Sequence, residues 1–541
     1  MDTFFTAHPD LQFHFQQMPL EEIFRLRGEA APTERAAFAR RKLTELAELA
    51  ERQFAPRATE ADREGCRLEN GRVILPEATR QNLAALKAGG FMGVTLPQTY
   101  GGLALPASVY AMMNEILSRA DASLQNLFGL QVIGETLWRF GSEEQRARVL
   151  PPFAAGEWDG AMVLTEPEAG SDLQAVQTRA VQDANGVWRL NGKKHFITNG
   201  GAQILLVLAR SEEGTRDARG LSLFLARPCP QITIARLEDK LGLHASPTCE
   251  LHFDNAPAEL VGRPRFGLVK YVMSMMNGAR LMVSAQALGV AEAARSAAWS
   301  FCRQRRQFGK PLCEIAPVRE MLTRTDALVA ASRALLYCTC RHIDLRDAWE
   351  ARAAEGDPQA AASAKREARL ADVLTPMTKA FCTEAANRCA YDSLQCHGGR
   401  GYMRDYPVER LLRDARIMNI YEGTTQMQIV AATAGLLRNG LEEAFAEMDA
   451  LPCAPATEAR LQALRDVRER LLAAQRTLPA EHIELLSRRL AHGLAIVLAG
   501  QLLLHEAAID AERLTIAERF LWEFLPEAET DATMLATPPP I

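Results

Sequence analysis

The hydrophobic pattern of this chain changes its period along the sequence, and this change restricts the possible folds more than any other feature. From about residue 34 to residue 156, apolar residues recur three and four positions apart, which predicts helices. From about residue 161 to residue 262, short apolar runs alternate with turn residues, which predicts a small antiparallel β domain. From residue 266 the helical period returns, with a break expected between Leu451 and Pro455. This order lacks the strand–helix alternation of a Rossmann sheet.

Local signals predict several individual elements. A helix is predicted to begin at Thr33, a capping residue, and to end before Pro56. Asn191-Gly192 is predicted to form a type I′ hairpin turn, because both residues tolerate a positive φ angle. Strands are also predicted at residues 204–210, 221–227, 232–238 and 249–253. A long helix is predicted to bury one face, made of Val283, Ala287, Val290, Ala294, Ala297 and Phe301.

A chain of 541 residues is long for one hydrophobic core, so we expect several domains. The period changes predict an α+β protein in four parts. These are an N-terminal helical domain at residues 1–158, a middle β domain at 159–265, a helical bundle at 266–440 and a helical extension at 441–541.

The composition is that of an ordinary soluble protein, with 48% hydrophobic and 24% charged residues. A net charge of -5 gives no global basic surface, so no nucleic-acid partner is expected. The first residues have no signal-peptide pattern, and the chain does not end in a peroxisomal signal. No uninterrupted apolar run reaches membrane-spanning length, the best being runs such as residues 204–209. We therefore expect a cytoplasmic protein without an integral membrane segment.

The eleven cysteines are scattered along the sequence. Only Cys338 and Cys340 lie close together, with His342 just beyond them, and this trio could be a fragment of a metal site. No second cluster with zinc-ligand spacing accompanies it. We therefore expect reduced thiols and no bound metal.

The stretch Ile420–Gln428, IYEGTTQMQ, contains a single carboxylate with no basic neighbour. Two interpretations fit Glu422. It can lie at the N-terminus of a helix whose caps are the following hydroxyl residues. It can instead be a general base beside a cofactor. The stretch alone leaves both open.

Further stretches are equally ambiguous when each is taken alone. Residues 164–172 form either a capped loop or a loop that offers hydroxyl and N–H donors to a ligand. Residues 196–201 are a strand end, with or without a flat ligand against Phe196. The cations of residues 303–309 either end a helix or bind phosphate. The glycines of residues 398–401 follow no strand, so they are not a dinucleotide fingerprint.

Taken together, six motifs in order resemble the acyl-CoA dehydrogenase family over roughly residues 40–435. They are AMVLTEPEAGSD, KKHFITNGG, KLGLHASPTCEL, RRQFGKPL, QCHGGRGYMRDYPVERLLRD and IYEGTTQMQ. The amino-acid sequence at residues 240–253 and 273–281 is similar to that of the larger members of the family, which also carry a C-terminal extension. These members include 3-methylmercaptopropionyl-CoA dehydrogenase-like proteins. The resemblance implies the acyl-CoA dehydrogenase-like fold and a homo-oligomer, with a homodimer favoured over a homotetramer.

The resemblance also implies FAD bound between the β domain and the C-terminal helices. Phe196 stands where many members carry tryptophan, and an aromatic ring still offers a flat wall. Glu422 matches the family's catalytic base, whereas Ala279 occupies the position that some members use instead. The implied substrate contacts are Ser171, Arg280, Tyr421 and Gly423. The implied FAD contacts are Leu164, Thr165, Ser171, Phe196, Thr198, Arg305, Phe308, Gln395, Gly399, Thr424 and Gln426.

The implied reaction is FAD-dependent α,β-dehydrogenation of an acyl-CoA thioester, as in fatty-acid β-oxidation, with electrons passing to an electron-transfer flavoprotein. An acyl-CoA oxidase, and a flavin-bearing binding protein that does not dehydrogenate, are the alternatives. Leu124 and Phe128 lie in a segment that sets the depth of the acyl pocket in this family. The acyl group stays open between straight, branched, aryl and sulfur-containing chains.

Overall fold

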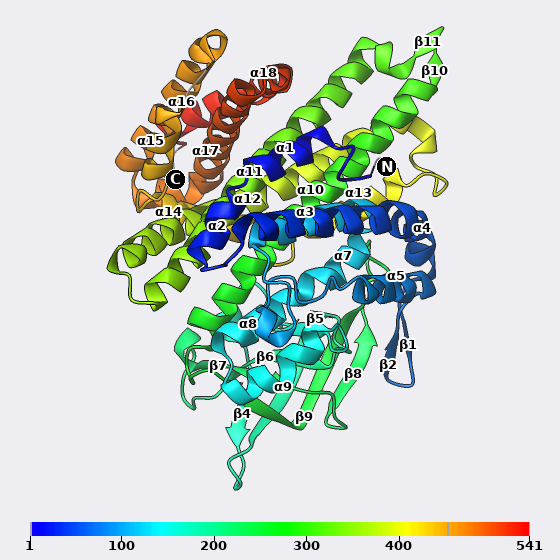
Figure 1. Cartoon of the computed structure of the whole chain (residues 1–541), viewed down its shortest axis with the longest axis vertical. Helices are drawn as coiled ribbons and strands as arrows, with labels where there is room; N and C mark the ends of the chain where they lie inside the picture. The colour runs from blue at the N-terminus through cyan, green and yellow to red at the C-terminus, as the bar shows by residue number, and fades with distance from the viewer. Residues whose placement is uncertain (1–2, 452–453, 540–541) are drawn as a thin grey trace. The chain divides into compact units, whose positions relative to one another are not determined.

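A computed structural model describes residues 3–451 and 454–539. The chain divides into two compact units. The bundle unit comprises Met1–Arg40 and Val283–Ile541, and the barrel unit comprises Arg41–Met282. Each unit is described by itself, and Figure 1 colours both by residue number.

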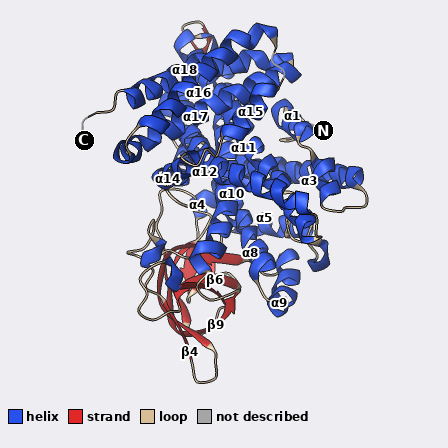
Figure 2. Cartoon of the chain, turned by 90° about the vertical axis from the view of Figure 1, so that its left-hand side faces the viewer, coloured by secondary structure: helices blue, strands red, loops and turns tan. Residues whose placement is uncertain are grey.

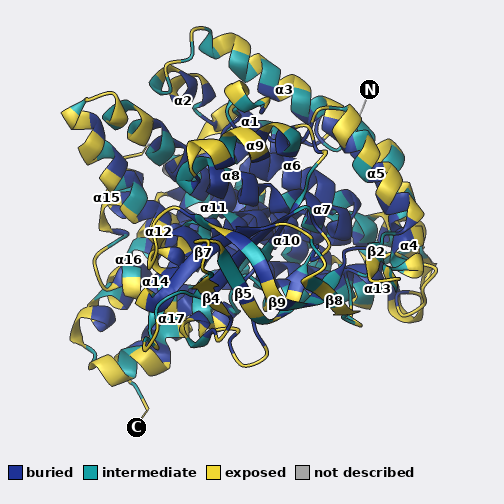
Figure 3. Cartoon of the chain, turned by 90° about the horizontal axis from the view of Figure 1, so that it is seen from below, coloured by how far each residue is buried: buried dark blue, intermediate teal, exposed yellow. Residues whose placement is uncertain are grey.

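The bundle unit is built from helices. In chain order they are α1 (Pro9–Gln17), α2 (Leu20–Leu26), the start of α3 (Pro32–Leu49), the larger part of α10 (Met273–Gln304), α11 (Ala316–Ala354), α12 (Pro358–His397), α13 (Val408–Met418), α14 (Thr425–Leu436), α15 (Glu442–Ala450), α16 (Glu458–Thr477), α17 (Ala480–Ile509) and α18 (Leu514–Ala536). A short hairpin of β10 (Arg306–Gln307) and β11 (Lys310–Pro311) joins α10 to α11. The buried side of α11 is dark blue in Figure 3.

The barrel unit combines short helices with a sheet. Its helices are α4 (Ala55–Glu64), α5 (Glu77–Ala88), α6 (Ala107–Ala120), α7 (Ala122–Phe128), α8 (Val132–Phe140) and α9 (Glu143–Ala154). Its strands are β1 (Arg67–Glu69), β2 (Arg72–Ile74), β3 (Gly160–Val163), β4 (Arg179–Gln182), β5 (Trp188–Thr198), β6 (Ile204–Arg210), β7 (Leu221–Ala226), β8 (Ile232–Leu237) and β9 (Thr248–Val261). The main sheet is red in Figure 2.

The main sheet closes on itself. Strand pairing runs β6–β4–β5–β9–β7 and returns to β6, while β3 joins β6 and β8 joins β9. Closure leaves few unpaired edges and encloses a core that includes Leu190, Ile197, Phe224 and Leu251. The predicted β domain is confirmed, but the expectation that it is wholly antiparallel is wrong. Strand β3 runs parallel to β6, as β4 does where it meets β6, because long connections rather than hairpins separate these strands.

The predicted hairpin turn at Asn191-Gly192 is wrong. These residues lie inside β5, and the turn between β4 and β5 lies six residues earlier, at Asn185-Gly186. A Cβ atom on Gly192 would lie 2.5 Å from the Thr178 hydroxyl oxygen. This glycine is therefore needed for close approach within the sheet and not for a turn.

The same dipeptide signal marks a hairpin that we did not predict. Asn70 and Gly71 have φ angles of 50° and 73°, and they join β1 to β2 within the region expected to be helical. Both central residues with positive φ are what a type I′ turn requires. The local signal was thus present, but the helical period on either side concealed it.

The predicted end of the first long helix is also wrong. Helix α3 continues through a π-helical turn at Ala50–Phe54 into α4, and Pro56 lies in the first turn of α4. Proline has no N–H group and crowds the preceding turn of an α-helix. The wider π turn, closed by a hydrogen bond from the Ala55 N–H, accommodates it.

Other predicted elements are confirmed. The strands at 204–210, 221–227 and 232–238 correspond to β6, β7 and β8, and the run at 249–253 lies within the longer β9. On α10, the first four residues of the predicted face are buried, whereas Ala297 and Phe301 are partly buried. Two residues of the expected break, 452 and 453, lie outside the described residues; α15 ends before them and α16 begins after them.

The N-terminal helices pack within the bundle unit through buried charges. Arg333 of α11 is 1% exposed and pairs with Asp10 of α1 and with Glu292 of α10, the latter at 3.2 Å. Arg513 lies 2.5 Å from Asp10 and 2.7 Å from Glu506. Burial alone would raise the pKa of Asp10, but the two guanidinium groups hold it well below its usual range. Figure 1 shows α1, in dark blue, beside α11.

One helix differs from the expectation that no segment is long and apolar enough to span a membrane. Among the described residues, α17 alone passes that test of length and composition. Of its apolar window, 78% is buried within the structure. Its neighbours include α11, α12, α14, α16 and α18, so here it serves as a core helix.

Candidate functional site

The candidate residues are divided between the two units. The barrel unit holds Leu164, Thr165, Ser171, Phe196, Thr198 and Arg280. The bundle unit holds Arg305, Phe308, Gln395, Gly399, Tyr421, Glu422, Gly423, Thr424 and Gln426.

In the barrel unit, a buried ion pair fixes the loop that follows β3. Lys194 of β5 is fully buried, lies 2.9 Å from the Glu166 carboxylate and donates to the Leu164 carbonyl at 2.7 Å. The Glu166 carboxylate also accepts the N–H groups of Gln177 and Thr178. Burial lowers the pKa of Lys194 to about 8, against the attraction of Glu166. We did not single out Lys194 from the sequence, because Leu164 and Glu166, its partners, lie far from it along the chain.

Replacing Lys194 with methionine should lower the free energy of unfolding by about 2–3 kcal/mol, because a buried carboxylate loses a charged partner. The matched control is Lys193→Met, since Lys193 is the exposed neighbour on the same strand. Urea unfolding of both variants measures the difference. Equal stability of the two variants would show that the Lys194–Glu166 pair does not hold the loop.

Phe196 is displayed by a distortion of β5. The register against β9 shifts between Lys194 and Ile197, and Phe196 adopts a φ angle of +59°, which is rare for an aromatic residue. Its ring is 59% exposed and stacks on His195 with ring centroids 4.0 Å apart. A bulge that turns an aromatic side chain outward is typical of a ligand-binding strand end. Thr198, two residues on, is half-buried and pairs with Thr248.

The other candidates in this unit differ in exposure. The Thr165 carbonyl accepts the His195 N–H at 2.9 Å, which joins the loop to the strand beside Phe196. Ser171 is exposed near the far end of the same loop. Arg280 is buried on α10 and donates to the Asn277 side chain at 2.9 Å. The structure thus connects Thr165 with the Phe196 strand end.

In the bundle unit, Glu422 lies in the loop that precedes α14. Its φ angle is +53°, and that of Gly423 is +88°. Helix α14 begins at Thr425, and its N-cap is Thr424, whose hydroxyl accepts the Met427 N–H at 3.4 Å. Glu422 therefore lies two residues before a helix N-cap that is a hydroxyl residue, as one interpretation expected, and this position leaves the general-base interpretation open. A left-handed conformation for a glutamate indicates a backbone that the surrounding structure imposes.

Two buried side chains impose it. The Gln428 amide nitrogen donates to the carbonyls of Glu422 and Gly423 at 3.0 and 2.9 Å. The Lys379 ammonium group donates to the Gly423 carbonyl at 2.9 Å. We did not predict either residue, because Lys379 lies on another helix and no local pattern marks it. These hydrogen bonds hold the backbone carbonyls of the loop. The Glu422 carboxylate takes no part in them.

The residue before Glu422 adds a further constraint. The Tyr421 hydroxyl donates to the Gln286 side chain of α10. Burial raises the pKa of Tyr421 far above its usual value, and the negative charge of Glu422 adds to this effect. The Glu422 carboxylate is therefore near a phenol that stays neutral.

Three further candidates of the bundle unit lie at exposed positions, whereas Arg305 is partly buried. Phe308 is 93% exposed at the tip of the β10–β11 hairpin, where Phe308 and Gly309 both have positive φ. Gln395 and Gly399 are exposed at the end of α12.

Packing brings these exposed positions to one end of the bundle. The rings of Phe301, near the end of α10, and His397, at the end of α12, stack with centroids 4.2 Å apart. Arg305 lies four residues after Phe301 on the chain, and its N–H donates to the Phe301 carbonyl at 2.8 Å. Gln426 is exposed on the first turn of α14, close in sequence to Glu422. The candidates of this unit thus form one group at the helix ends and a second group on the Glu422 loop.

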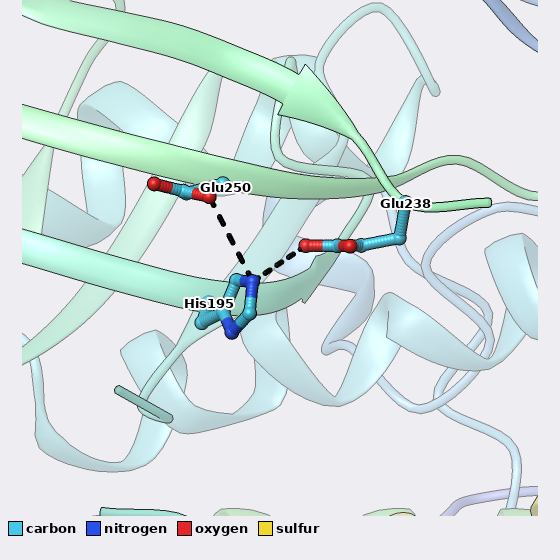
Figure 4. A group of neighbouring side chains, drawn as sticks. All are labelled: His195, Glu238 and Glu250. Atoms are coloured by element: carbon cyan, nitrogen blue, oxygen red, sulfur yellow. Dashed lines mark ion pairs between the residues drawn. The ribbon is translucent and has the colours of Figure 1, made fainter. Parts of the chain in front are cut away.

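We expected no metal site, and among the described residues one group has the geometry for an ion. It consists of His195, Glu238 and Glu250, whose ligand atoms lie within 4.8 Å of one another (Figure 4). The Arg236 guanidinium lies 2.9 Å from the His195 ring and 3.1 Å from each carboxylate. The Arg236 side chain thus already pairs with both acidic groups.

The trio considered as a metal fragment forms a different arrangement. Cys338, Cys340 and His342 all lie on α11, and the His342 ring nitrogen Nδ1 is 2.7 Å from the Glu367 carboxylate of α12. Burial alone would lower the pKa of His342, but Cys338 and Glu367 outweigh it and raise the pKa to about 9. His342 is therefore charged at neutral pH and pairs with a carboxylate.

This pair predicts a pH dependence of stability. A histidine whose pKa is raised by folding stabilises the protein fully below pH 6.5, and that stabilisation is lost as the pH rises through 9. Between these pH values, the wild type should lose about 2 kcal/mol more of its unfolding free energy than a His342→Gln variant. Urea unfolding at several pH values measures both slopes. Parallel pH profiles would contradict the raised pKa.

Comparison with known proteins places the whole arrangement in context. Three family models match consecutive parts of the chain: acyl-CoA dehydrogenase N-terminal domain at residues 40–157, middle domain at 161–256 and C-terminal domain at 269–437. The 3-methylmercaptopropionyl-CoA dehydrogenase of Ruegeria pomeroyi is 36% identical over 445 residues, which are 77% of this chain and 72% of the relative.

Two solved structures are similar to the chain. A chain in the structure of the electron-transferring flavoprotein of Acidaminococcus fermentans is 32% identical, with a TM-score of 0.65, and the match covers 74% of this chain and 98% of the other. An acyl-CoA dehydrogenase of Bacillus anthracis, complexed with FAD, has a TM-score of 0.77 at 22% identity, covering 93% and 88% of the two chains. The second likeness shows that the fold extends beyond the three matched domains.

Proposed function

This chain belongs to the acyl-CoA dehydrogenase family, and we propose that it oxidises an acyl-CoA thioester to the trans-2-enoyl-CoA with Glu422 as the catalytic base. Membership makes it a flavin-dependent oxidoreductase. The observation that carries the proposal is the conformation of the Glu422 loop. Glu422 has a left-handed backbone conformation, and hydrogen bonds from Gln428 and Lys379 hold the backbone of the loop in place.

The side chains of each unit fit FAD, the cofactor of this family. In the barrel unit, Phe196 offers an exposed flat ring and Thr198 a hydroxyl group close to it. In the bundle unit, Arg305 offers a guanidinium group suited to a pyrophosphate. The space beside Gly399 is open, because a Cβ atom on this glycine would meet nothing within 4 Å. We assign to FAD contacts Leu164, Thr165, Ser171, Phe196, Thr198, Arg305, Phe308, Gln395, Gly399, Thr424 and Gln426.

The chemistry requires a base and a hydride acceptor to act on adjacent carbons. When bound, FAD supplies the acceptor for the hydrogen that leaves the β-carbon. Glu422 removes the proton of the α-carbon, whose acidity the neighbouring thioester carbonyl increases. Because Gln428 and Lys379 fix the backbone at Glu422 and Gly423, the carboxylate needs little reorganisation before it reacts. Ser171, Arg280, Tyr421 and Gly423 are the proposed substrate contacts.

The proposal extends to partners and setting. The likeness to a chain in the flavoprotein structure from Acidaminococcus fermentans supports an electron-transfer flavoprotein as the electron acceptor. We propose a homodimer in the cytoplasm that works in fatty-acid β-oxidation, on the strength of the resemblance and of the composition.

Anaerobic bleaching of the bound flavin tests this function. The purified protein is mixed with straight-chain, branched, aryl and sulfur-containing acyl-CoA thioesters, and the loss of flavin absorbance is followed. We expect one class to bleach the flavin rapidly and to yield the enoyl product. Fast reoxidation by oxygen alone would favour an oxidase, and no bleaching of correctly bound flavin would favour a binding protein.

A further inference from the structure

A cavity in the bundle unit lies next to the segment that follows Glu422. Residues of α12, α14 and α17 line it, with contributions from α11 and α18. These three helices contact one another, and Figures 1 and 2 show them side by side. Its volume is about 70 Å³. Most of its wall is apolar and includes Phe381, Ile429, Ala432, Ala495 and Phe524. This space is several times the roughly 10–15 Å³ that one water needs, so it admits a small organic molecule.

The cavity wall contains one buried hydrogen-bond acceptor without a partner. Gln428 is fully buried, and its amide nitrogen is already used by the carbonyls of Glu422 and Gly423. Its amide oxygen has no hydrogen-bond partner within residues 3–451 and 454–539. These two bonds also fix the orientation of the amide, because only the nitrogen end can donate to carbonyls. An unpaired buried acceptor destabilises the empty state and favours a ligand that donates one hydrogen bond.

The other polar groups of the wall carry charges of both signs. The Glu384 carboxylate accepts the Thr425 hydroxyl at 3.2 Å and the Asn419 amide at 2.7 Å, so a bound anion would meet a like charge. The exposed side chains of the wall include the arginines Arg388 and Arg488, which disfavour a cation. The wall as a whole therefore matches a neutral molecule better than either kind of ion.

The cavity wall is bonded to both ends of the Glu422 loop. Asn419 precedes the loop, and its backbone carbonyl accepts the Thr425 N–H, which follows the loop, at 2.9 Å. Glu384 bonds both residues, and Gln428 bonds the carbonyls between them. A donor bound to the Gln428 oxygen would polarise the amide and strengthen the bonds that its nitrogen makes.

We propose that this cavity binds a small neutral molecule, about the size of one six-membered ring and carrying one hydroxyl group, and that the bound molecule steadies the Glu422 loop. The hydroxyl donates to the Gln428 amide oxygen, and the apolar body fills the space between α12, α14 and α17. This site is separate from the residues assigned to FAD and acyl-CoA, and its occupation is a means of regulating the loop.

Phenol and anisole are the probes, because they have similar bodies and only phenol can donate a hydrogen bond. Calorimetry on the full chain with its flavin bound should show that phenol binds about tenfold or more tightly than anisole. Hydrogen exchange of residues 420–428 should slow with phenol and not with anisole. Equal binding of both probes would overturn the assignment of Gln428, and binding of neither would show that water or nothing fills the cavity.

A pair of variants on α17 locates the binding. Ala495→Leu fills the cavity and should reduce phenol binding about tenfold or more, because the added side chain takes the ligand's place. Ala508→Leu makes the same change at an exposed position of the same helix and should leave phenol binding unchanged. Flavin content and circular dichroism verify that both variants fold. Undiminished phenol binding by a folded Ala495→Leu variant would place the ligand elsewhere, and the probe pair remains decisive if that variant does not fold.

Discussion

Replacing Glu422 with glutamine should slow the reduction of bound flavin by acyl-CoA by a factor of about 10²–10⁴, the usual contribution of a general base. Glutamine keeps the shape of the side chain but cannot take a proton from the α-carbon. The loop should keep its conformation, because the bonds from Gln428 and Lys379 hold backbone carbonyls rather than the side chain. Anaerobic stopped-flow measurement of flavin absorbance, with the substrate class found by bleaching, gives the rate.

The control for this substitution is Glu481→Gln, which removes an exposed carboxylate on α17. In the Glu481→Gln variant, acyl-CoA should reduce the bound flavin at the wild-type rate. The Glu422→Gln variant should contain the same amount of FAD as the wild type, since the change concerns the proton and not the cofactor. If a flavin-loaded Glu422→Gln variant reacts as fast as the control, another group is the base.

The second large effect is expected for stability, at Arg333. Replacing it with methionine should lower the free energy of unfolding by about 3–5 kcal/mol, because breaking a buried ion pair leaves uncompensated charge. The substitution removes a partner from both Asp10 and Glu292. Asp10 retains Arg513 at 2.5 Å and Glu292 retains Arg295 at 3.1 Å, so each carboxylate loses one arginine and keeps another. The shift of the urea unfolding midpoint measures the loss.

The matched control is Arg341→Met, an exposed arginine on the same helix, which should stay within about 0.5 kcal/mol of the wild type. Adding Glu292→Gln to Arg333→Met should recover part of the lost stability, because it removes a buried negative charge that lost one of its two arginines. A destabilisation of Arg333→Met no larger than that of the control would mean that the buried network contributes no net stability.

The order of helical and β regions was predictable because it depends on the period of apolar residues, which is a local property. Individual turns were less predictable. The pairs Asn70-Gly71, Asn185-Gly186 and Asn191-Gly192 carry the same local signal, yet only the first two form turns. What distinguishes the third is the long pairing of β5 with β9, which a local signal does not contain.

The candidate site likewise contains some residues that were predictable from the sequence and others that were not. Glu422 could be found from the sequence, because a motif surrounds it and resembles a known family. Gln428 lies in the same motif, but its role depends on the direction in which an amide points. Lys379 and Lys194 could not be assigned from the sequence, because their partners lie 44 and 30 residues away along the chain. Buried lysines of this kind are recognisable only once the fold has brought their partners to them.

The buried charges around Asp10 also constrain the order in which this protein can be completed during synthesis. Asp10 is synthesised long before Arg513 and Glu506, because the ribosome makes the chain from its N-terminal side. Until the ribosome has made residue 513, α1 lacks one of the cations that compensate its carboxylate. Helix α1 can therefore reach its final packing only after α17 and Arg513 have been made.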